Sequence, residues 1–377
     1  MSEARQMIDA LTLRGLPGVG PMRFRALVDH FGSPATALDA SAAEIAAVPE
    51  VSPGTPARSL ARTLELGAEG TAARSDAVRN AREVQERCAS GGIAAIVYGT
   101  AGYPARLRHL KDPPPVLFAL GRTSLLPRRW AAIVGSRGAT ASGRRVAWGL
   151  GASWAGRGRC VVSGMAMGID AEAHRGALPG PTAAVLGSGV DVVSPPRNRT
   201  LYRKIVECGV VVSEFAPGVR AEPHHFPRRN RIIAALARDV IIVEASRRSG
   251  ALITAEIALD LGREVLAVPG PIDRPNSEGT NRLIADGATI IVETAPDDVM
   301  QYTVPLPEEP DLRQLLSALP ASPVTVEEAA RLSRRDAEEV GPLLTILEIR
   351  GHLTPTRDGR VMRTPGRGSM AVREGAA

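Results

Sequence analysis

Residues 130–170 read WAAIVGSRGATASGRRVAWGLGASWAGRGRCVVSGMAMGID, and this stretch decides the fold. An apolar strand at 131–134 runs into a glycine loop at 135–138, and a helical run then leads to a second apolar strand at 160–162. Short apolar strands that end in glycine loops and lead into helices are typical of a parallel α/β sheet. The carboxyl ends of such strands open onto a crevice where ligands bind. Since one of these loops carries Arg137, it is the first candidate for a binding site.

The same alternation continues to about residue 300. Helices separate the predicted strands, which lie at 131–134, 159–162, 182–186, 210–212, 240–243, 265–268 and 289–292. Strands that are apolar on both faces and separated by helices indicate a parallel sheet covered on both sides. Two further strands, at 93–98 and 116–120, are predicted to join the edge of this sheet. We therefore predict an α/β fold with a doubly wound, mostly parallel sheet in a domain at 86–302.

Smaller regions flank the predicted sheet domain. Residues 1–85 are helical in pattern, and their turn at 16–21 resembles a helix-hairpin-helix, whose backbone N–H groups can hold a phosphate. A plain turn between two helices explains the same residues. After a proline-rich acidic linker at 303–311, three short helices and a β-hairpin predict a winged helix at 312–364. The tail at 365–377 is predicted to be disordered.

The composition favours a polyanionic partner. The formal net charge is +6 and the pI is about 9.8. Lys111 and Lys204 are the only lysines, so nearly all of the positive charge is arginine, whose planar fork donates two parallel hydrogen bonds to a phosphate. A bias toward arginine can also reflect codon usage. Aromatic residues make up 3% of the chain, so any base stacking must rest on one or two rings.

The sequence also argues against a membrane or secreted protein. No apolar run approaches the length of a membrane span, and the first residues lack a basic segment followed by an apolar one. Cys88, Cys160 and Cys208 are too few and too scattered for a disulfide framework or a zinc site. We interpret them as core thiols of a cytoplasmic protein.

The loops after the predicted strands lack the fingerprints of common nucleotide enzymes. A dinucleotide site needs G-x-G-x-x-G after the first strand, whereas this chain offers only GSRG at 135–138. The glycine–lysine ending of a P-loop is also missing. Asp170 and His174 share a helix face, but no nucleophile elbow or metal-ligand set accompanies them, so we interpret them as scaffold. His224 and His225 lack the spacing of metal ligands, and we expect no catalytic residue, metal or cofactor.

The strongest signal for a polyanion is PHHFPRRNR at 223–231, which opens a helix. Its arginines lie in the first turn, where the helix dipole favours acids rather than cations. A bound phosphate chain would explain this arrangement, and Phe226 supplies one ring for stacking on a base. The alternative is that these arginines pair with acids such as Glu214 and Glu222.

A series of blocks between residues 134 and 284 resembles the DNA-processing protein A family, also called DprA or Smf. The blocks are VGSR at 134–137, SGMAMGIDAEAH at 163–174, LGSGVD at 186–191, SEF at 213–215, FPRRNRII at 226–233, EA at 244–245, SGALITA at 249–255, VPG at 268–270, GTN at 279–281 and LI at 283–284. Because so many blocks occur in order, the resemblance is far more specific than any single loop.

The resemblance implies an extended Rossmann-like domain that binds single-stranded DNA without sequence preference and is not an enzyme. Members of the family protect incoming single strands during natural transformation and load the RecA recombinase onto them. The implied partners are single-stranded DNA, RecA, the single-strand-binding protein and a second copy of the chain. Many members also carry an N-terminal domain of the sterile-alpha-motif or helix-hairpin-helix type and a C-terminal winged helix.

The family's DNA pocket and dimer interface can be carried over residue by residue. The implied dimer interface contains Leu283, Ile284 and Ile290. The implied DNA contacts are Gly135, Ser136, Arg137, Gly164, Arg199, Phe226, Arg228, Arg229, Asn230, Arg231, Ser249 and Gly250.

Two departures from the family pattern affect this pocket. The chain has SPP at 194–196 where the family usually has Tyr-Pro, so a ring that could line the groove is lost. A lysine that is common ahead of the phenylalanine is replaced by PHH at 223–225, which puts charge at that point in doubt and could make binding respond to acidity.

Two other functions stay open. Related Rossmann-like sheets host nucleotide N-glycosidases with a Pro-Gly-Gly-x-Gly-Thr loop and a following glutamate, whereas this chain has only PGP at 269–271 and, separately, EGT at 278–280. A duplex-binding winged helix is the other alternative. Its second and third helices carry four glutamates beside three arginines, so a protein contact is favoured there; these residues are Glu327, Glu328, Glu338, Glu339, Arg331, Arg334 and Arg335.

Overall fold

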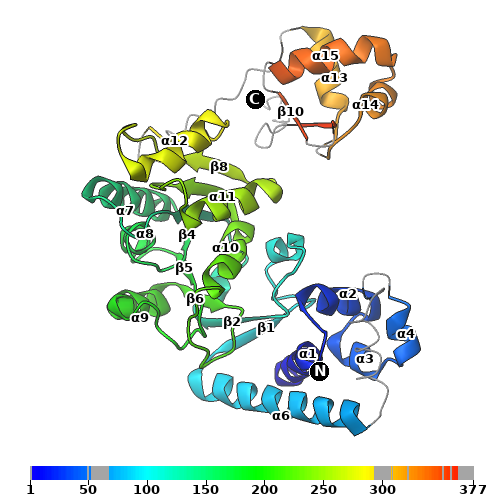
Figure 1. Cartoon of the computed structure of the whole chain (residues 1–377), viewed down its shortest axis with the longest axis vertical. Helices are drawn as coiled ribbons and strands as arrows, with labels where there is room; N and C mark the ends of the chain where they lie inside the picture. Colours follow the sequence, from blue (N-terminus) through cyan, green and yellow to red (C-terminus); the bar gives the residue numbers. More distant parts are fainter. Residues whose placement is uncertain are drawn as a thin grey trace, which may run out of the picture. The chain divides into compact units, whose positions relative to one another are not determined.

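The computed structural model of the chain describes residues 2–48, 51, 68–292, 307, 309–320, 322–349, 352–356 and 359–363. The chain forms two compact units, Met1–Asp298 and Val299–Ala377, whose elements are labelled in Figure 1. The sequence places a domain boundary between residues 85 and 86, whereas helix α6, Ala68–Gly91, runs across that position. The helices before it belong to the same compact unit as the sheet.

The first unit is built on a nine-stranded sheet in the order β1-β2-β6-β5-β4-β3-β7-β8-β9. At one end of the sheet β2 pairs antiparallel with both β1 and β6, whereas the strands from β3 to β9 run parallel to one another. Their bounds are β1 Ala94–Val97, β2 Val116–Gly121, β3 Trp130–Val134, β4 Cys160–Ser163, β5 Thr182–Val185, β6 Val210–Ser213, β7 Ala237–Ile242, β8 Glu264–Ala267 and β9 Thr289–Ile290. This arrangement confirms the predicted doubly wound, mostly parallel α/β fold.

The strand order reverses between β3 and β7. From β3 the chain moves outward through β4, β5 and β6, and it then crosses to β7 on the other side of β3. Ligands of doubly wound sheets bind at this kind of switch point, beyond the carboxyl ends of the strands. The central strands are apolar on both faces, and every residue of β3 is buried. The core therefore fixes the strand ends from which the surrounding loops emerge.

Helices cover the parallel sheet. Helix α7 packs on α8, and α10 packs on α11, as can be followed in Figure 1. All three cysteines are free, with Cys88 and Cys160 buried and Cys208 half-buried. None of the helices in the described part of the chain has the length and apolar character that crossing a bilayer requires. The helices are α7 Ala141–Gly156, α8 Ile169–Ala177, α9 Arg199–Cys208, α10 His225–Leu236, α11 Gly250–Asp260 and α12 Glu278–Ala285.

Short helices precede the sheet: α1 Glu3–Gly15, α2 Pro21–Phe31, α3 Pro34–Asp39 and α4 Ala42–Ala46. Ser41 and Glu44 form a capping box at the start of α4, which stabilises so short a helix. In the turn between α1 and α2, Val19 N donates to Leu16 O and Gly20 N donates to Gly18 O. Since these N–H groups already bond within the turn, the geometry supports a plain helical turn rather than a phosphate-binding one.

The second unit is a winged helix, as predicted. Thr325 and Glu328 form a capping box before the middle helix, and Val324 pairs with Val361 of the hairpin. The buried cluster of this unit includes Leu315, Val340 and Leu347. Most of the predicted linker and the whole predicted tail lie outside the described residues. The elements are α13 Pro310–Ala318, α14 Val326–Ser333, α15 Ala337–Ile349, β10 Leu353–Pro355 and β11 Val361–Arg363.

Candidate functional site

The loops that follow β3, β4, β5, β6 and β7 form one edge of the sheet, here called the C-terminal rim. At the switch point, Ser136 N donates to Glu244 O at 2.7 Å and joins the loop after β3 to the loop after β7. Gly135 allows this close approach, because a Cβ there would lie 2.7 Å from Ile169 Cγ1 and 2.8 Å from Glu244 O. The two loops are therefore held together by the backbone itself.

The Glu244 carboxylate braces the same loops from its side chain. Its Oε2 accepts from Thr140 N at 2.9 Å, and its Oε1 accepts from Thr140 Oγ1 at 2.5 Å. Thr140 in turn caps α7 by accepting from Gly143 N. Asn276 Nδ2 reaches both Gly138 O at 3.1 Å and Glu244 Oε2 at 3.4 Å. One half-buried carboxylate thus fixes the start of α7 and the loop that carries Arg137.

Arg137 stacks on Phe226. Its guanidinium carbon lies 4.7 Å from the centroid of the Phe226 ring, within the range of a cation–π interaction. Arg137 is exposed and Phe226 is half-buried at the start of α10. The contact brings together two residues that the family resemblance assigns to one pocket. It places a cation and an aromatic ring side by side on the rim.

Arg229 is buried beneath the rim. Its Nη1 donates to Gly164 O at 2.6 Å and also to Val185 O, so it ties the ends of β4 and β5 to α10. A Cβ on Gly164 would lie 2.1 Å from Arg229 Nη1, which explains the glycine at this position. Burial lowers the pKa of Arg229 to about 10, an effect that Asp170 opposes. Burial raises the pKa of Asp170, and the charge of Arg229 counteracts that rise.

Asp170 and His174 are scaffold residues, as the sequence indicates. Asp170 Oδ2 accepts from Gly164 N at 3.2 Å and from Ala166 N at 3.4 Å. His174 Nδ1 lies 2.7 Å from Thr182 Oγ1, and burial lowers the pKa of His174 to about 3. Both side chains are buried and bond inside the fold, so neither is presented to a substrate on the rim.

Arg228 and Arg231 share the carboxylate of Glu214. Glu214 Oε2 lies 2.5 Å from Arg231 Nη2 and 2.9 Å from Arg228 Nη2. Arg231 also donates from Nη1 to Asp112 O at 2.7 Å and is buried. The structure therefore bears out the alternative that arginines of this segment pair with Glu214, while Glu222 lies beside His224 instead. Arg228 keeps part of its side chain exposed.

The remaining predicted contacts lie on the outer part of the rim. Asn230 Nδ2 donates to Gly250 O at 3.2 Å, which holds α10 against the start of α11. Ser249 caps α11 by accepting from Ala251 N. Arg199, the first residue of α9, is exposed. Of the twelve predicted DNA contacts, the rim presents nine at least partly to solvent and buries Gly164, Arg229 and Arg231; contact with DNA stays a prediction for all of them.

Comparison with known proteins gives the family. The family model described as DNA recombination-mediator protein A matches residues 94–303, more than half of the chain, and the DprA winged helix domain matches residues 301–367. The chain belongs to the DprA family. A DprA protein of Mycobacterium tuberculosis is 42% identical over 300 residues, covering 74% of this chain and 76% of that protein. The DNA processing protein DprA of Bacillus subtilis is 39% identical over 223 residues, covering 57% and 75%.

Solved DprA structures share the fold. The X-ray structure of DNA processing protein A from Streptococcus pneumoniae aligns with a TM-score of 0.64 and 32% identity, covering 79% of this chain and 97% of that one. DNA processing protein A from Helicobacter pylori, whose structure is described for its single-stranded DNA binding mode, aligns with a TM-score of 0.50 and 29% identity, covering 54% and 92%. Both neighbours are DprA proteins, in agreement with the resemblance seen in the sequence.

Two exposed cations of this DprA chain were missed by the sequence reasoning. Arg247 and Arg248 are exposed in the loop between β7 and α11, at the switch point. Ser249 N donates to Ser246 O at 3.0 Å, so the two arginines lie in a tight turn. The available signal was a pair of arginines directly after a predicted strand. They add positive charge on the β7 side of Arg137.

One group of side chains on the same rim has metal-ligand chemistry. Glu222, His224 and His225 bring their ligand atoms within 4.8 Å of one another. Each already has a protein neighbour: Glu222 Oε2 lies 3.4 Å from His224 Nδ1, and His225 Nδ1 lies 3.0 Å from Gly187 O. The expectation that the chain binds no metal stays a prediction.

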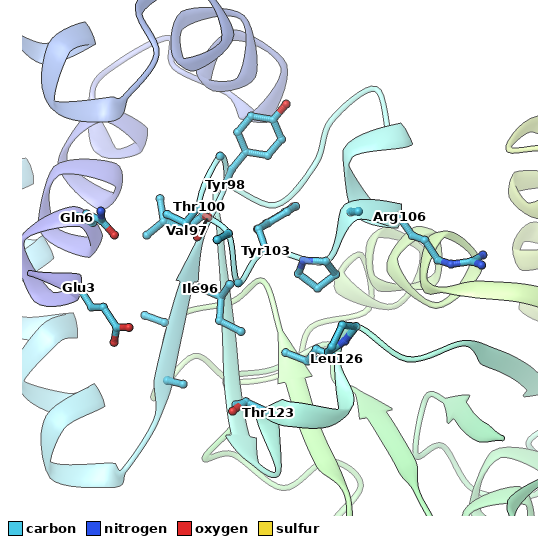
Figure 2. Close-up of a pocket in the computed structure, with 18 of the residues that line it drawn as sticks. Glu3, Gln6, Ile96, Val97, Tyr98, Thr100, Tyr103, Arg106, Thr123 and Leu126 are labelled. Carbon is cyan, nitrogen blue, oxygen red and sulfur yellow. Dashed lines mark hydrogen bonds between the residues drawn. The ribbon is translucent and has the colours of Figure 1, made fainter. Parts of the chain in front are cut away.

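A separate cavity of about 1110 Å³ lies away from the rim. Figure 2 shows it between helix α1, which contributes Glu3 and Gln6, and strand β1 with the loop that follows it. Tyr103 lines the cavity, and its hydroxyl donates to Pro114 O. None of the predicted DNA contacts lines this cavity.

Proposed function

We propose that the chain binds single-stranded DNA at the C-terminal rim, without sequence preference, and acts as a recombination mediator that hands the strand to RecA. The observation that carries this proposal is the stack of exposed Arg137 on Phe226. The cation can bind a phosphate while the ring beside it offers a face to a base. The single-stranded DNA binding mode described for the Helicobacter pylori relative supports it.

The charge of the rim supports binding through the backbone of the strand. Arg137, Arg199, Arg247 and Arg248 are exposed, and they come from three different strand ends. Contacts to phosphate carry no sequence information, and an aromatic ring stacks on any base. We assign the buried Arg229 and Arg231 to positioning this surface rather than to touching the strand.

The proposed partners extend beyond DNA. A recombination mediator acts between a single strand and its recombinase, so we propose that the chain protects the strand, displaces the single-strand-binding protein and loads RecA. We also propose a homodimer through Leu283, Ile284 and Ile290. The edge strand β9 supports a protein contact there, because Ile290 is 45% exposed and Val292 beyond it is 62% exposed.

We propose that this function is non-catalytic. The alternative of a nucleotide N-glycosidase rests on a Pro-Gly-Gly-x-Gly-Thr loop with a following glutamate, whereas this chain has only PGP at 269–271 and, separately, EGT at 278–280. The other acid–base candidates, Asp170 and His174, are buried and bonded inside the fold. Incubation with nucleoside monophosphates tests the alternative by chromatography of the products. Release of a free base would overturn the non-catalytic assignment.

Fluorescence anisotropy with labelled oligo-dT tests the binding site. We expect Arg137→Ala and Phe226→Ala to weaken binding, and Phe226→Tyr to retain it because the ring is kept. For single strands, each lost phosphate contact lowers the slope of log K against log salt by about 0.7. Arg79→Ala on α6 is the matched control for the loss of one exposed arginine. Parental affinity in both Ala variants would place the binding site elsewhere.

A second assay tests the mediator step. RecA strand exchange is measured on a strand already coated with single-strand-binding protein, with and without the chain. We expect stimulation by the parent and less stimulation by Arg137→Ala. A parent that binds the strand but leaves RecA activity unchanged would contradict RecA loading while leaving DNA binding intact.

A further inference from the structure

The opposite edge of the sheet carries a second set of arginines. Strands β4, β3, β7 and β8 are neighbours in the sheet. Arg159 directly precedes β4, Arg129 precedes β3, Arg238 is the second residue of β7, and Arg263 precedes β8. Parallel strands all begin on the same edge, so these four residues form a line across it. Together with Arg106 and Arg128 they are called the arginine row.

Contacts along this edge confirm that the residues converge. Arg106 Nη1 donates to Ala237 O, at the first residue of β7, at 3.2 Å. Figure 2 shows the Arg106 guanidinium directed away from Glu3 and Gln6, out of the cavity. Arg263 Nη2 donates to Ala235 O at 3.3 Å, just before β7. Both guanidinium groups therefore reach the edge where β7 begins.

The positive charges of the row act on one another. Burial lowers the pKa of Arg106, and the charges of Arg129 and Arg238 lower it further. Burial lowers the pKa of Arg263, and the positive charge of Arg106 lowers it further. Asp239 is half-buried among these cations, and burial raises its pKa although Arg238, Arg159 and Arg106 oppose the rise.

The row has few opposing charges. Within the described residues, Asp239 is the one carboxylate that forms an ion pair with it, at 3.7 Å from Arg238 Nε. Glu264, the nearest acid in sequence to Arg263, instead accepts from Thr289 Oγ1 at 2.6 Å. Six cations gathered around one acid repel one another. The backbone bonds of Arg106 and Arg263, and the stack of Arg159 on the Trp154 ring at 4.9 Å, hold these side chains in place but do not neutralise their charge. A polyanion laid along the edge would neutralise it.

We propose that the arginine row is a second nucleic-acid surface, which binds the phosphate backbone of a strand independently of the C-terminal rim. Neighbouring strands lie about 4.8 Å apart, so four strand starts span about 15 Å. That length matches roughly four nucleotides at about 3.4 Å per nucleotide. Arg129, Arg159 and Arg238 are exposed along the line and can each donate to a phosphate.

The geometry separates this surface from the first one. The strands between the two edges are four to six residues long. At about 3.3 Å per residue they hold the edges about 13–20 Å apart, so no single phosphate can contact both. Around Arg128 and Arg129 the surface also differs from a membrane-binding face, which pairs cations with exposed apolar side chains. Leu126 and Trp130, beside Arg128 and Arg129, are 3% and 2% exposed.

The test removes three exposed charges from the full-length chain. The row variant is Arg129→Gln, Arg159→Gln, Arg238→Gln. The matched control removes three arginines from the mixed-charge surface of α6: Arg74→Gln, Arg79→Gln, Arg82→Gln. A second row variant, Arg129→Gln with Arg159→Gln, leaves the Arg238–Asp239 pair intact in case the triple variant unfolds. Circular dichroism melting verifies the fold of each variant.

Short oligo-dT is titrated at low salt, and the readouts are strands bound per chain, affinity and salt slope. We expect the parent and the α6 control to bind in two phases and the row variant to lose one phase. The affinity of that phase should fall at least tenfold, and the salt slope should drop by about 2 because three contacts of about 0.7 each are removed. Row variants that match the α6 control in all three readouts would overturn the proposal.

The result is separable from the proposed function of the rim. In an Arg137→Ala, Phe226→Ala background, we expect the remaining binding to disappear when the row changes are added. If the rim changes alone have no effect while the row changes abolish binding, the row stands and the rim proposal fails. If vesicles containing phosphatidylserine, or polyglutamate, bind the row as tightly as oligo-dT does, the assignment to nucleic acid is overturned.

Discussion

Arg137 and Arg229 lie close enough for the charge of Arg137 to lower the pKa of Arg229, yet they occupy opposite environments. Arg137 is exposed and rests on the ring of Phe226. Arg229 is buried and donates to two backbone carbonyls at the ends of β4 and β5. Two arginines that the family resemblance assigns to the same pocket therefore lie in different environments and can have different roles. Burial and carbonyl partners make one of them part of the scaffold, and exposure leaves the other for a ligand.

Replacing Arg229 should have the largest effect on stability. Arg229→Ala removes the positive charge that favours ionisation of buried Asp170, and it removes the side-chain donor to the carbonyls of Gly164 and Val185. We therefore expect a loss of about 3–5 kcal/mol in the free energy of unfolding. Urea unfolding measures this loss. Arg137→Ala is the control and should change stability by less than about 0.5 kcal/mol. An Arg229→Ala variant of parental stability that fails to bind DNA would reverse the comparison.

Glu214 extends the buried side of the comparison. Its carboxylate holds both Arg231 and Arg228, so Glu214→Gln should lower the free energy of unfolding by about 3 kcal/mol. Arg228→Ala, which removes the more exposed partner, should cost about 1 kcal/mol or less. The same urea titration measures both variants. Equal losses of the free energy of unfolding in Glu214→Gln and Arg228→Ala would show that the more exposed ion pair stabilises the fold as much as the buried one does.

The buried side also predicts a dependence on acidity. The pKa of His174 is lowered from 6.5 to about 3 by burial first and by the charge of Arg229 second. The unfolded chain therefore binds a proton at His174 before the folded chain does, and stability falls as the pH drops from about 6.5 toward 3. We expect His174 to account for a loss of about 2 kcal/mol between pH 7 and pH 5.

Urea unfolding of the parent and of His174→Gln, at pH 7 and at pH 5, isolates this contribution. The difference in the free energy of unfolding between the two proteins should shrink at pH 5. At that pH only the parent binds a proton at residue 174 when it unfolds, and this proton uptake favours its unfolding. Asp170, whose pKa is raised, changes both proteins alike and drops out of the comparison. Parallel pH profiles would show that His174 is accessible to protons in the folded state.

Replacing the exposed Arg137 should give the smallest change in free energy of these variants, and this change should affect DNA binding rather than stability. Arg137→Ala should weaken oligo-dT binding about tenfold, which is about 1.4 kcal/mol, with the fold unchanged. Arg137→Lys keeps the charge but loses the planar stack on Phe226, so its affinity for oligo-dT should lie between that of the parent and that of Arg137→Ala. Anisotropy at two salt concentrations measures both variants. An Arg137→Lys variant as weak as Arg137→Ala would show that the planar stack matters more than the charge.

The sequence was sufficient for the fold because its signals are local. Apolar strands such as 131–134 and 210–212 are short and bounded by glycine, and helices fill the intervals, so the period alone indicates a parallel sheet. The structure adds capping boxes at Ser41 and Thr325, which begin two further helices. The resemblance to the DprA family added the order of the blocks, which single loops could not supply.

The interior of the site was not predictable in the same way. Whether an arginine is buried depends on which carbonyls lie opposite it, and Gly164 and Val185 are far from Arg229 in the chain. Glu244 appears in the family blocks without a role, because its bonds to Thr140 and Asn276 exist only once the sheet is assembled. The arginine row is likewise scattered in sequence and becomes a line only through the strand order.

The hydrogen bonds of Asn276 connect the loop that carries Arg137 to the segment that leads into α12. Asn276 donates to Gly138 O, next to Arg137, and its own carbonyl accepts from Ala245 N. Two residues later the chain enters α12, which carries Leu283 and Ile284 of the proposed dimer contact. A bound DNA strand that displaced the loop at Gly138 would either break the hydrogen bond between Gly138 O and Asn276 Nδ2 or shift the segment that leads to α12. The proposed DNA site and the proposed dimer contact are thus connected through the hydrogen bonds of one residue, Asn276.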